Sequence, residues 1–107
     1  MTLSGLHHVA VICSDYTVSK QFYTEVLGLR VVSELYRTER NSWKLDLEIP
    51  GGVQIELFSF PGAPARLSYP EARGLRHLAF RVRDLDQDVA GLLEKGVAVE
   101  DIRTDEL

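Results

Sequence analysis

The chain has 107 residues, of which 45% are hydrophobic, and a formal net charge of −4. This length suits one domain with a modest core, and the mixture of acidic and basic residues argues against a nucleic-acid-binding surface, which is usually basic. Apolar stretches are far shorter than the roughly 20 residues that span a bilayer. The N-terminus also lacks the features of a signal peptide. We therefore expect a cytoplasmic protein that binds neither nucleic acid nor membrane.

The first half of the chain predicts a helix and four strands in the order βαβββ. The expected elements are a strand at 6–13, a helix at 15–27, and strands at 29–37, 42–49 and 53–60. Asp15 is the expected N-cap of the helix, and Gly28 is expected to end it. Val18, Phe22 and Val26 recur every four residues, as one face of a helix requires.

The second half of the chain resembles the beginning of the first. Its expected elements are a loop at 61–73, a strand at 75–82, a helix between Asp84 and Gly96, and a strand at about 97–103. A shift of 69 residues places His8 on His77 and Asp15 on Asp84, each in the same expected role. A duplicated βα unit explains this match better than a short-period repeat does.

The sequence therefore predicts an α+β fold in which two βαβ-containing modules form a mixed sheet with both helices outside. The modules are expected at about 1–60 and 74–107, within a single domain of residues 1–107. Only a βαβ order is visible for the second module.

Three side chains that can bind metal are predicted to point to the same side of this sheet. Successive side chains of a strand alternate between its two faces. The wholly apolar faces should pack under the helices, which leaves His8, Glu56 and His77 on the concave side. Two imidazoles and a carboxylate suit zinc, nickel, cobalt or iron(II). Such a cation would also offset the cost of placing a carboxylate between two apolar neighbours.

Each of these residues also has a simpler interpretation. A single strand histidine is usually a hydrogen-bonded structural residue. Glu56 alone would pair with Arg37 or Arg81, or lie on a solvated face. His7 is expected on the helix side and becomes the ligand only if the strand register is shifted by one residue.

Three motifs, LHHVAVICSD, IELFSF and GLRHLAFRVRD, resemble those of glyoxalase I and its relatives in the vicinal oxygen chelate superfamily. The resemblance extends over nearly the whole chain and implies paired βαβββ modules that form a curved mixed sheet around a metal pocket, with the second module truncated at its C-terminus. In this resemblance His8, Glu56 and His77 match the ligands of the first, fourth and fifth strands. The fourth ligand of the family, a glutamate on the final strand, has no counterpart before Leu107.

The resemblance also implies a reaction. A glutamate at position 56 resembles glyoxalase I, because ring-cleaving dioxygenases and fosfomycin-resistance enzymes take no ligand from this strand and methylmalonyl-CoA epimerase commonly has glutamine there. It implies a metal-dependent lyase or isomerase that converts a small vicinal-oxygen substrate through an enediolate-like intermediate, with Glu56 as the catalytic proton carrier. Glutathione is not the expected substrate, because Ile12 and Phe60 replace an arginine and an asparagine of glyoxalase I.

Alternative functions use the same pocket. A small-molecule binding protein of the bleomycin-resistance kind would use the aromatic residues Trp43, Phe58 and Phe60. A related dioxygenase and a nonfunctional fragment are the other two alternatives. We expect a homodimer, because modules from two chains pair in many glyoxalase-like proteins and an incomplete module leaves exposed strand edges.

Overall fold

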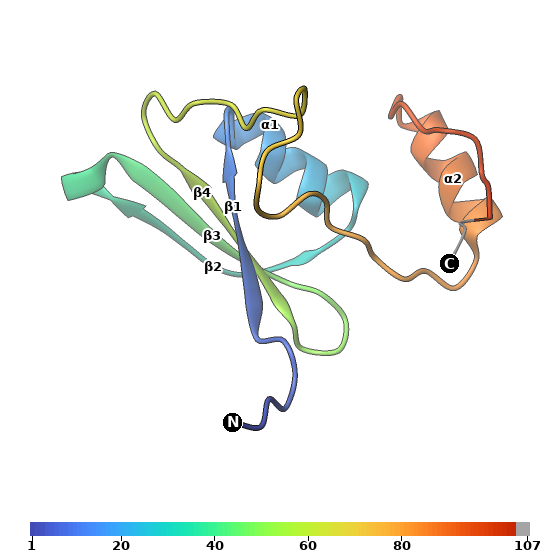
Figure 1. The fold of residues 1–107 in the computed structure, drawn as a ribbon, viewed down its shortest axis with the longest axis horizontal. Coiled ribbons are helices and arrows are strands. Elements are labelled where there is room, and N and C mark those ends of the chain that lie inside the picture. Colours follow the sequence, from blue (N-terminus) through green and yellow to red (C-terminus); the bar gives the residue numbers. More distant parts are fainter. Residues whose placement is uncertain (105–107) are drawn as a thin grey trace. The chain divides into compact units, whose positions relative to one another are not determined.

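The computed structural model describes residues 1–104 of the chain (Figure 1). These residues divide into two compact units, one from Met1 to Ser68 and one that starts at Tyr69. The boundary between the units falls inside the loop predicted at 61–73. No helix among residues 1–104 is both long and apolar enough to cross a membrane.

The first unit has the predicted βαβββ order. Its strands are β1 (His8–Cys13), β2 (Arg30–Arg37), β3 (Ser42–Glu48) and β4 (Gln54–Ser59). The predicted helix is present as α1 (Tyr16–Gln21) followed by a π-helical turn (Phe22–Val26), and a 3₁₀ turn (Thr38–Arg40) joins β2 to β3. The Asp15 side chain accepts a hydrogen bond from the Val18 backbone N–H at 3.1 Å, so it caps α1 as predicted.

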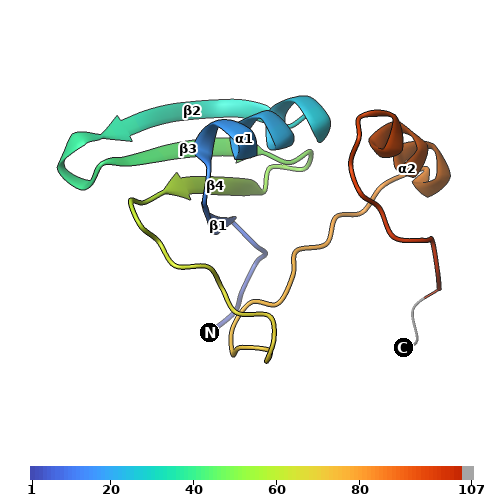
Figure 2. The ribbon, with the colours of Figure 1, turned by 90° about the horizontal axis from the view of Figure 1, so that it is seen from above.

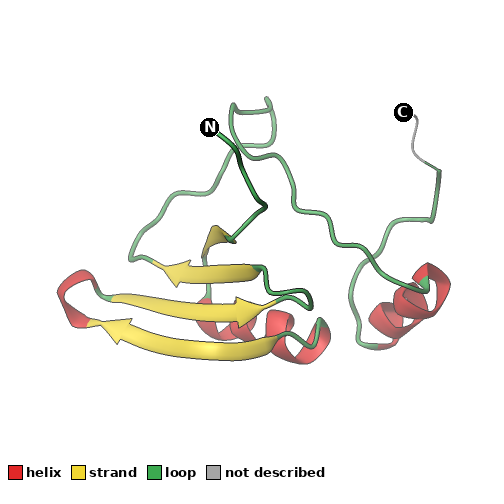
Figure 3. Cartoon of the chain, turned by 90° about the horizontal axis from the view of Figure 1, so that it is seen from below, coloured by secondary structure: helices red, strands yellow, loops and turns green. Residues whose placement is uncertain are grey.

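The four strands form one mixed sheet in the order β1-β4-β3-β2. β1 and β4 are parallel, whereas β4 with β3 and β3 with β2 are antiparallel. α1 lies in front of the strands in Figure 2 and behind them in the opposite view of Figure 3, so it covers one face of the sheet. This architecture confirms the predicted α+β class and its first βαβββ module.

The core lies between the sheet and α1. Four side chains of β3 and β4 are completely buried there, namely Leu45, Leu47, Ile55 and Leu57. Val11 and Cys13 of β1 pack against them from the same face, as strand alternation predicted. Burying each large apolar side chain stabilises the fold by about 1.5–3 kcal/mol. The sheet is therefore held by its apolar face, and its other face is free to carry polar groups.

The second unit contains the helix α2 (Leu85–Glu94). Asp84 caps it by accepting a hydrogen bond from the Gln87 backbone N–H at 3.0 Å. The strands predicted at 75–82 and 97–103 are not formed among residues 1–104. A strand requires a neighbour that completes its hydrogen-bonded ladder, and the described part of the chain provides none for these segments. Alternating apolar residues were therefore not sufficient evidence for a strand.

Candidate functional site

The face of the sheet opposite α1, here called the polar face, carries the candidate site. Strand alternation brings side chains of all four strands onto it. They are His8, Ser33, Arg37, Lys44, Asp46, Glu56 and Phe58. In the register of the sheet, Ala10, Glu56 and Asp46 lie opposite one another on successive strands.

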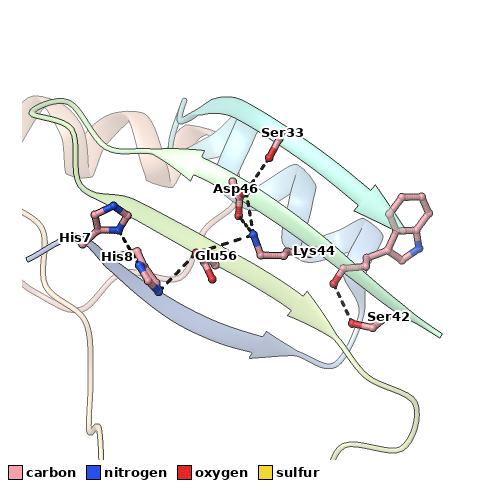
Figure 4. Close-up of polar contacts among 8 residues, drawn as sticks. His7, His8, Ser33, Ser42, Lys44, Asp46 and Glu56 are labelled. Atoms are coloured by element: carbon pink, nitrogen blue, oxygen red, sulfur yellow. Dashed lines mark hydrogen bonds and ion pairs between the residues drawn. The ribbon is translucent and has the colours of Figure 1, made fainter. Parts of the chain in front are cut away.

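His8 and Glu56 meet on this face. The Nε2 atom of His8 lies 3.6 Å from Oε2 of Glu56 (Figure 4). The Glu56 side chain is 20% exposed and that of His8 is 43% exposed, so the pair is accessible from one side. The parallel pairing of β1 with β4 creates this contact between residues that are far apart in the sequence.

The His8–Glu56 pair has the chemistry and spacing of two ligands of a divalent ion. A tetrahedral site with bonds of about 2.0–2.2 Å places neighbouring donor atoms about 3.4 Å apart, close to the observed 3.6 Å. The other ring nitrogen of His8, Nδ1, lies 2.9 Å from Nδ1 of His7. Ligating histidines usually have their second nitrogen hydrogen-bonded in this way. The two residues therefore fit a metal ion, with Nε2 of His8 as the donor.

His7 does not lie on the helix side as predicted. Its exposed ring contacts that of His8, with the ring centroids 5.1 Å apart. His7 directly precedes β1, which begins at His8.

His77, the third predicted ligand, lies in the irregular segment 75–82 of the second unit. Among residues 1–104 the structure contains no group of three or more His, Cys, Asp or Glu side chains arranged to hold a metal ion. The structure thus brings together two of the predicted ligands, His8 and Glu56. Ligation by His77 stays a prediction.

Lys44 and Asp46 belong to the same polar network, although the sequence analysis did not single them out. The Nζ atom of Lys44 lies 2.8 Å from Oδ1 of Asp46 and 4.0 Å from Oε2 of Glu56. Ser33 Oγ donates a hydrogen bond to Asp46 Oδ2 at 2.7 Å. Partial burial opposes the ionisation of Asp46, but the hydrogen bonds from Lys44 and Ser33 outweigh it and hold the pKa of this carboxyl below its usual value. The clean alternation of β3 was the signal that could have located both residues.

The other end of the polar face is aromatic and basic. The rings of Phe58 and Phe60 stack with their centroids 5.8 Å apart. The guanidinium carbon of Arg37 lies 5.2 Å from the centroid of Phe58 and 5.8 Å from that of Phe60. Arg40 lies 5.1 Å from the centroid of Phe60. Arg37 therefore lies over aromatic rings and does not form the expected pair with Glu56. The cationic group near Glu56 is that of Lys44.

Trp43 lies on the opposite side of the sheet from these phenylalanines. Its ring stacks on that of Tyr16 of α1, with centroids 5.1 Å apart and an interplanar angle of 4°. The expectation that Trp43 lines the same pocket as Phe58 and Phe60 was wrong, because odd and even positions of neighbouring strands point to opposite faces in this register.

Two bacterial proteins are similar to this chain over most of their length. YwkD of Bacillus subtilis is 57% identical over 107 residues, which are 100% of this chain and 84% of that protein. YaeR of Escherichia coli is 54% identical over 103 residues, which are 96% of this chain and 80% of that protein. A solved structure of a glyoxalase family protein from Enterococcus faecalis is 45% identical, has a TM-score of 0.90, and matches 99% of this chain and 83% of its own.

More distant solved structures share the fold. Glyoxalase I of Leishmania major is 22% identical with a TM-score of 0.76, over 95% of this chain and 73% of its own. The antibiotic-binding protein TnmS3 of Streptomyces sp. CB03234 is 25% identical with a TM-score of 0.73, over 98% of this chain and 81% of its own. The fosfomycin resistance protein FosX of Listeria monocytogenes, solved with Mn(II), is 18% identical with a TM-score of 0.72, over 96% of this chain and 78% of its own.

The family model of the glyoxalase/bleomycin resistance protein/dioxygenase superfamily matches residues 5–107. Members of this superfamily commonly bind divalent metal ions and small molecules. Together with the βαβββ sheet, this match shows that the chain belongs to the glyoxalase/bleomycin resistance protein/dioxygenase superfamily.

Proposed function

We propose that the protein is a divalent-metal-dependent lyase or isomerase of the glyoxalase I type. Its substrate would be a small molecule with two neighbouring oxygen atoms, converted through an enediolate-like intermediate. The observation that carries this proposal is the contact of His8 Nε2 with Glu56 Oε2 at 3.6 Å on the polar face. Family membership and the shared fold of glyoxalase I support it.

His8, Glu56 and His77 are the proposed ligands of zinc, nickel, cobalt or iron(II). When bound, such an ion supplies a Lewis acid that stabilises negative charge developing on the substrate oxygens. Glu56 is the proposed carrier of the substrate proton, because its carboxylate lies 3.6 Å from Nε2 of the proposed ligand His8. Lys44, with Nζ 4.0 Å from Glu56 Oε2, helps to orient that carboxylate.

Titration of zinc into chelator-treated full-length protein, followed by calorimetry and elemental analysis, tests this proposal. His8→Ala, Glu56→Gln and His77→Ala should each lower zinc affinity at least about 10–100-fold without changing the far-ultraviolet circular dichroism. His7→Ala removes a hydrogen-bond partner of His8 and not a proposed ligand, so it should lower the affinity less than His8→Ala does. Full zinc occupancy in the His8→Ala, His77→Ala double variant would contradict the assignment.

Glutathione hemithioacetals are proposed to be poor substrates. Ile12 and Phe60 stand where glyoxalase I has polar residues, and Ile12 lies opposite Phe58 in the sheet and is 58% exposed. These apolar side chains provide no hydrogen-bond donors at the two positions where glyoxalase I has polar residues. With metal-loaded protein, methylglyoxal and glutathione should react with kcat/KM below about 10⁴ M⁻¹ s⁻¹. A higher value would refute this substrate exclusion.

A binding protein that sequesters a small molecule is the second candidate function. The stacked rings of Phe58 and Phe60 favour it, because they form an aromatic platform on the polar face. Tight ligand binding by metal-free protein, with no turnover after metal loading, would support this alternative.

A homodimer is the proposed assembly. β2 is an edge strand of the sheet, and its Val31, Val32 and Leu35 are 39%, 42% and 56% exposed. Exposed apolar edge strands promote association. Light scattering at micromolar concentration should give twice the mass of the chain, and a stable monomer would contradict the proposal.

A further inference from the structure

Arg37 is unusually constrained for an arginine at the end of a strand. Its guanidinium lies over the rings of Phe58 and Phe60, and Nη2 donates a hydrogen bond to the Oγ of fully buried Ser42 at 3.2 Å. Its Nε is buried and has no hydrogen-bond partner among residues 1–104. Stacking on aromatic rings fixes the plane of a guanidinium and so directs its remaining donors.

The positive charge of this region is not neutralised within the described part of the chain. Neither Arg37 nor Arg40 forms an ion pair with a carboxylate of residues 1–104. Arg30, at the opposite end of the same strand, does pair with Glu48. We call Arg37, Arg40, Phe58 and Phe60 the Arg37 cluster.

The Arg37 cluster is connected to the candidate metal ligands along the polar face. Phe58 follows Glu56 by two positions on β4, and residues spaced in this way lie on one face about 7 Å apart. Lys44 bridges them, with Nζ 6.0 Å from the Phe58 centroid and 4.0 Å from Glu56 Oε2. A small molecule can therefore contact both regions at once.

We propose that the Arg37 cluster binds a carboxylate or phosphate group of the ligand whose other end lies at His8 and Glu56. The planar fork of an arginine matches either anion with two parallel hydrogen bonds, and charged hydrogen bonds are the strong ones. This inference rests on the proposed function and makes it more specific, since the substrate becomes an anion with a vicinal-oxygen end.

Three probes that share an α-hydroxycarboxylate end test the inference. They differ at the far end, which is a phosphate in 3-phosphoglycerate, a carboxylate in malate and a methyl group in lactate. We call 3-phosphoglycerate and malate the anionic probes, because each carries a second anionic group that lactate lacks. Calorimetry with the full chain, with and without zinc, should show that at least one of these two probes binds about 10–100-fold more tightly than lactate. The tighter of the two identifies the anion that the cluster prefers.

Variants of Arg37 complete the test. Arg37→Ala should reduce the anionic probe to the affinity of lactate, and Arg37→Lys should restore part of the difference because it keeps the charge but not the fork. Arg30→Ala is the matched control, since it removes the same residue type from the other end of β2, and it should keep the preference. Circular dichroism and zinc affinity of all variants should equal those of the native protein.

Each outcome separates the two proposals. Zinc binding without any preference for the anionic probes, or a preference that survives Arg37→Ala, overturns the anion site and leaves the metal proposal standing. An Arg37-dependent preference in a protein that binds no zinc supports the anion site and overturns the metal-dependent function. Failure of both anionic probes to bind at 10 mM, a concentration about ten times the weakest affinity usual for substrates, also overturns the anion site.

Discussion

The two faces of the first unit's sheet use the same strands for opposite purposes. On β4, Ile55 and Leu57 are completely buried toward α1, while Glu56 and Phe58 between and after them remain partly exposed on the polar face. Burial of the first pair contributes to stability, whereas the second pair is available to a ligand. Alternate residues of β4 therefore contribute to stability and to the candidate site. Substitutions at neighbouring positions should then affect one of these two properties and not the other.

Leu57→Ala and Glu56→Gln are the sharpest test of this separation. Leu57→Ala should lower the free energy of unfolding by about 2–5 kcal/mol, because it leaves a cavity in a fully buried site. Glu56→Gln, one residue away, should change it by less than about 1 kcal/mol, because the side chain is partly solvated. Urea unfolding of both variants checks this, and equal losses would show that the two faces are not independent.

Asp15→Ala tests how much the apolar face depends on its helix. The Asp15 carboxylate satisfies the Val18 backbone N–H at the start of α1, and loss of such a cap costs about 1 kcal/mol. Thermal or urea unfolding should show this loss, while zinc affinity, a property of the polar face, should not change. A fall in zinc affinity would indicate that the two faces are coupled.

The smallest expected effect is the contribution of Asp46 to the pH dependence of the free energy of unfolding. Its pKa is lower in the folded protein than in the unfolded chain, so its contribution to stability is present above the ordinary aspartate pKa of about 3.9 and is lost as the pH falls through the folded pKa. Urea unfolding between pH 7 and pH 2.5 should show a smaller decrease for Asp46→Asn than for the native protein. Identical pH profiles would exclude this contribution.

Local patterns predicted the first unit well. The helix cap at Asp15 and the strands at 42–49 and 53–60 were predicted from neighbours along the chain, and each is present near its predicted position. The common face of His8 and Glu56 also followed from alternation, because each residue needs only its own strand to define its side.

The second unit shows the limit of such patterns. Segment 75–82 alternates as β1 does, yet the described chain offers it no hydrogen-bonding neighbour and it does not form a strand. A helix completes its hydrogen bonds within its own segment, so the prediction of α2 succeeded where that of the flanking strands was wrong.

The sequence by itself determined which residues of the first unit are apolar, which alternate and where α1 begins, because these properties depend on local periodicity. Only the tertiary structure decided that Lys44 accompanies Glu56, that Arg37 stacks on Phe58, and that Trp43 packs on Tyr16. Those contacts depend on which strands are adjacent and in which register. Register is set by hydrogen bonds and burial between segments distant in the chain, and no short stretch of sequence contains that information.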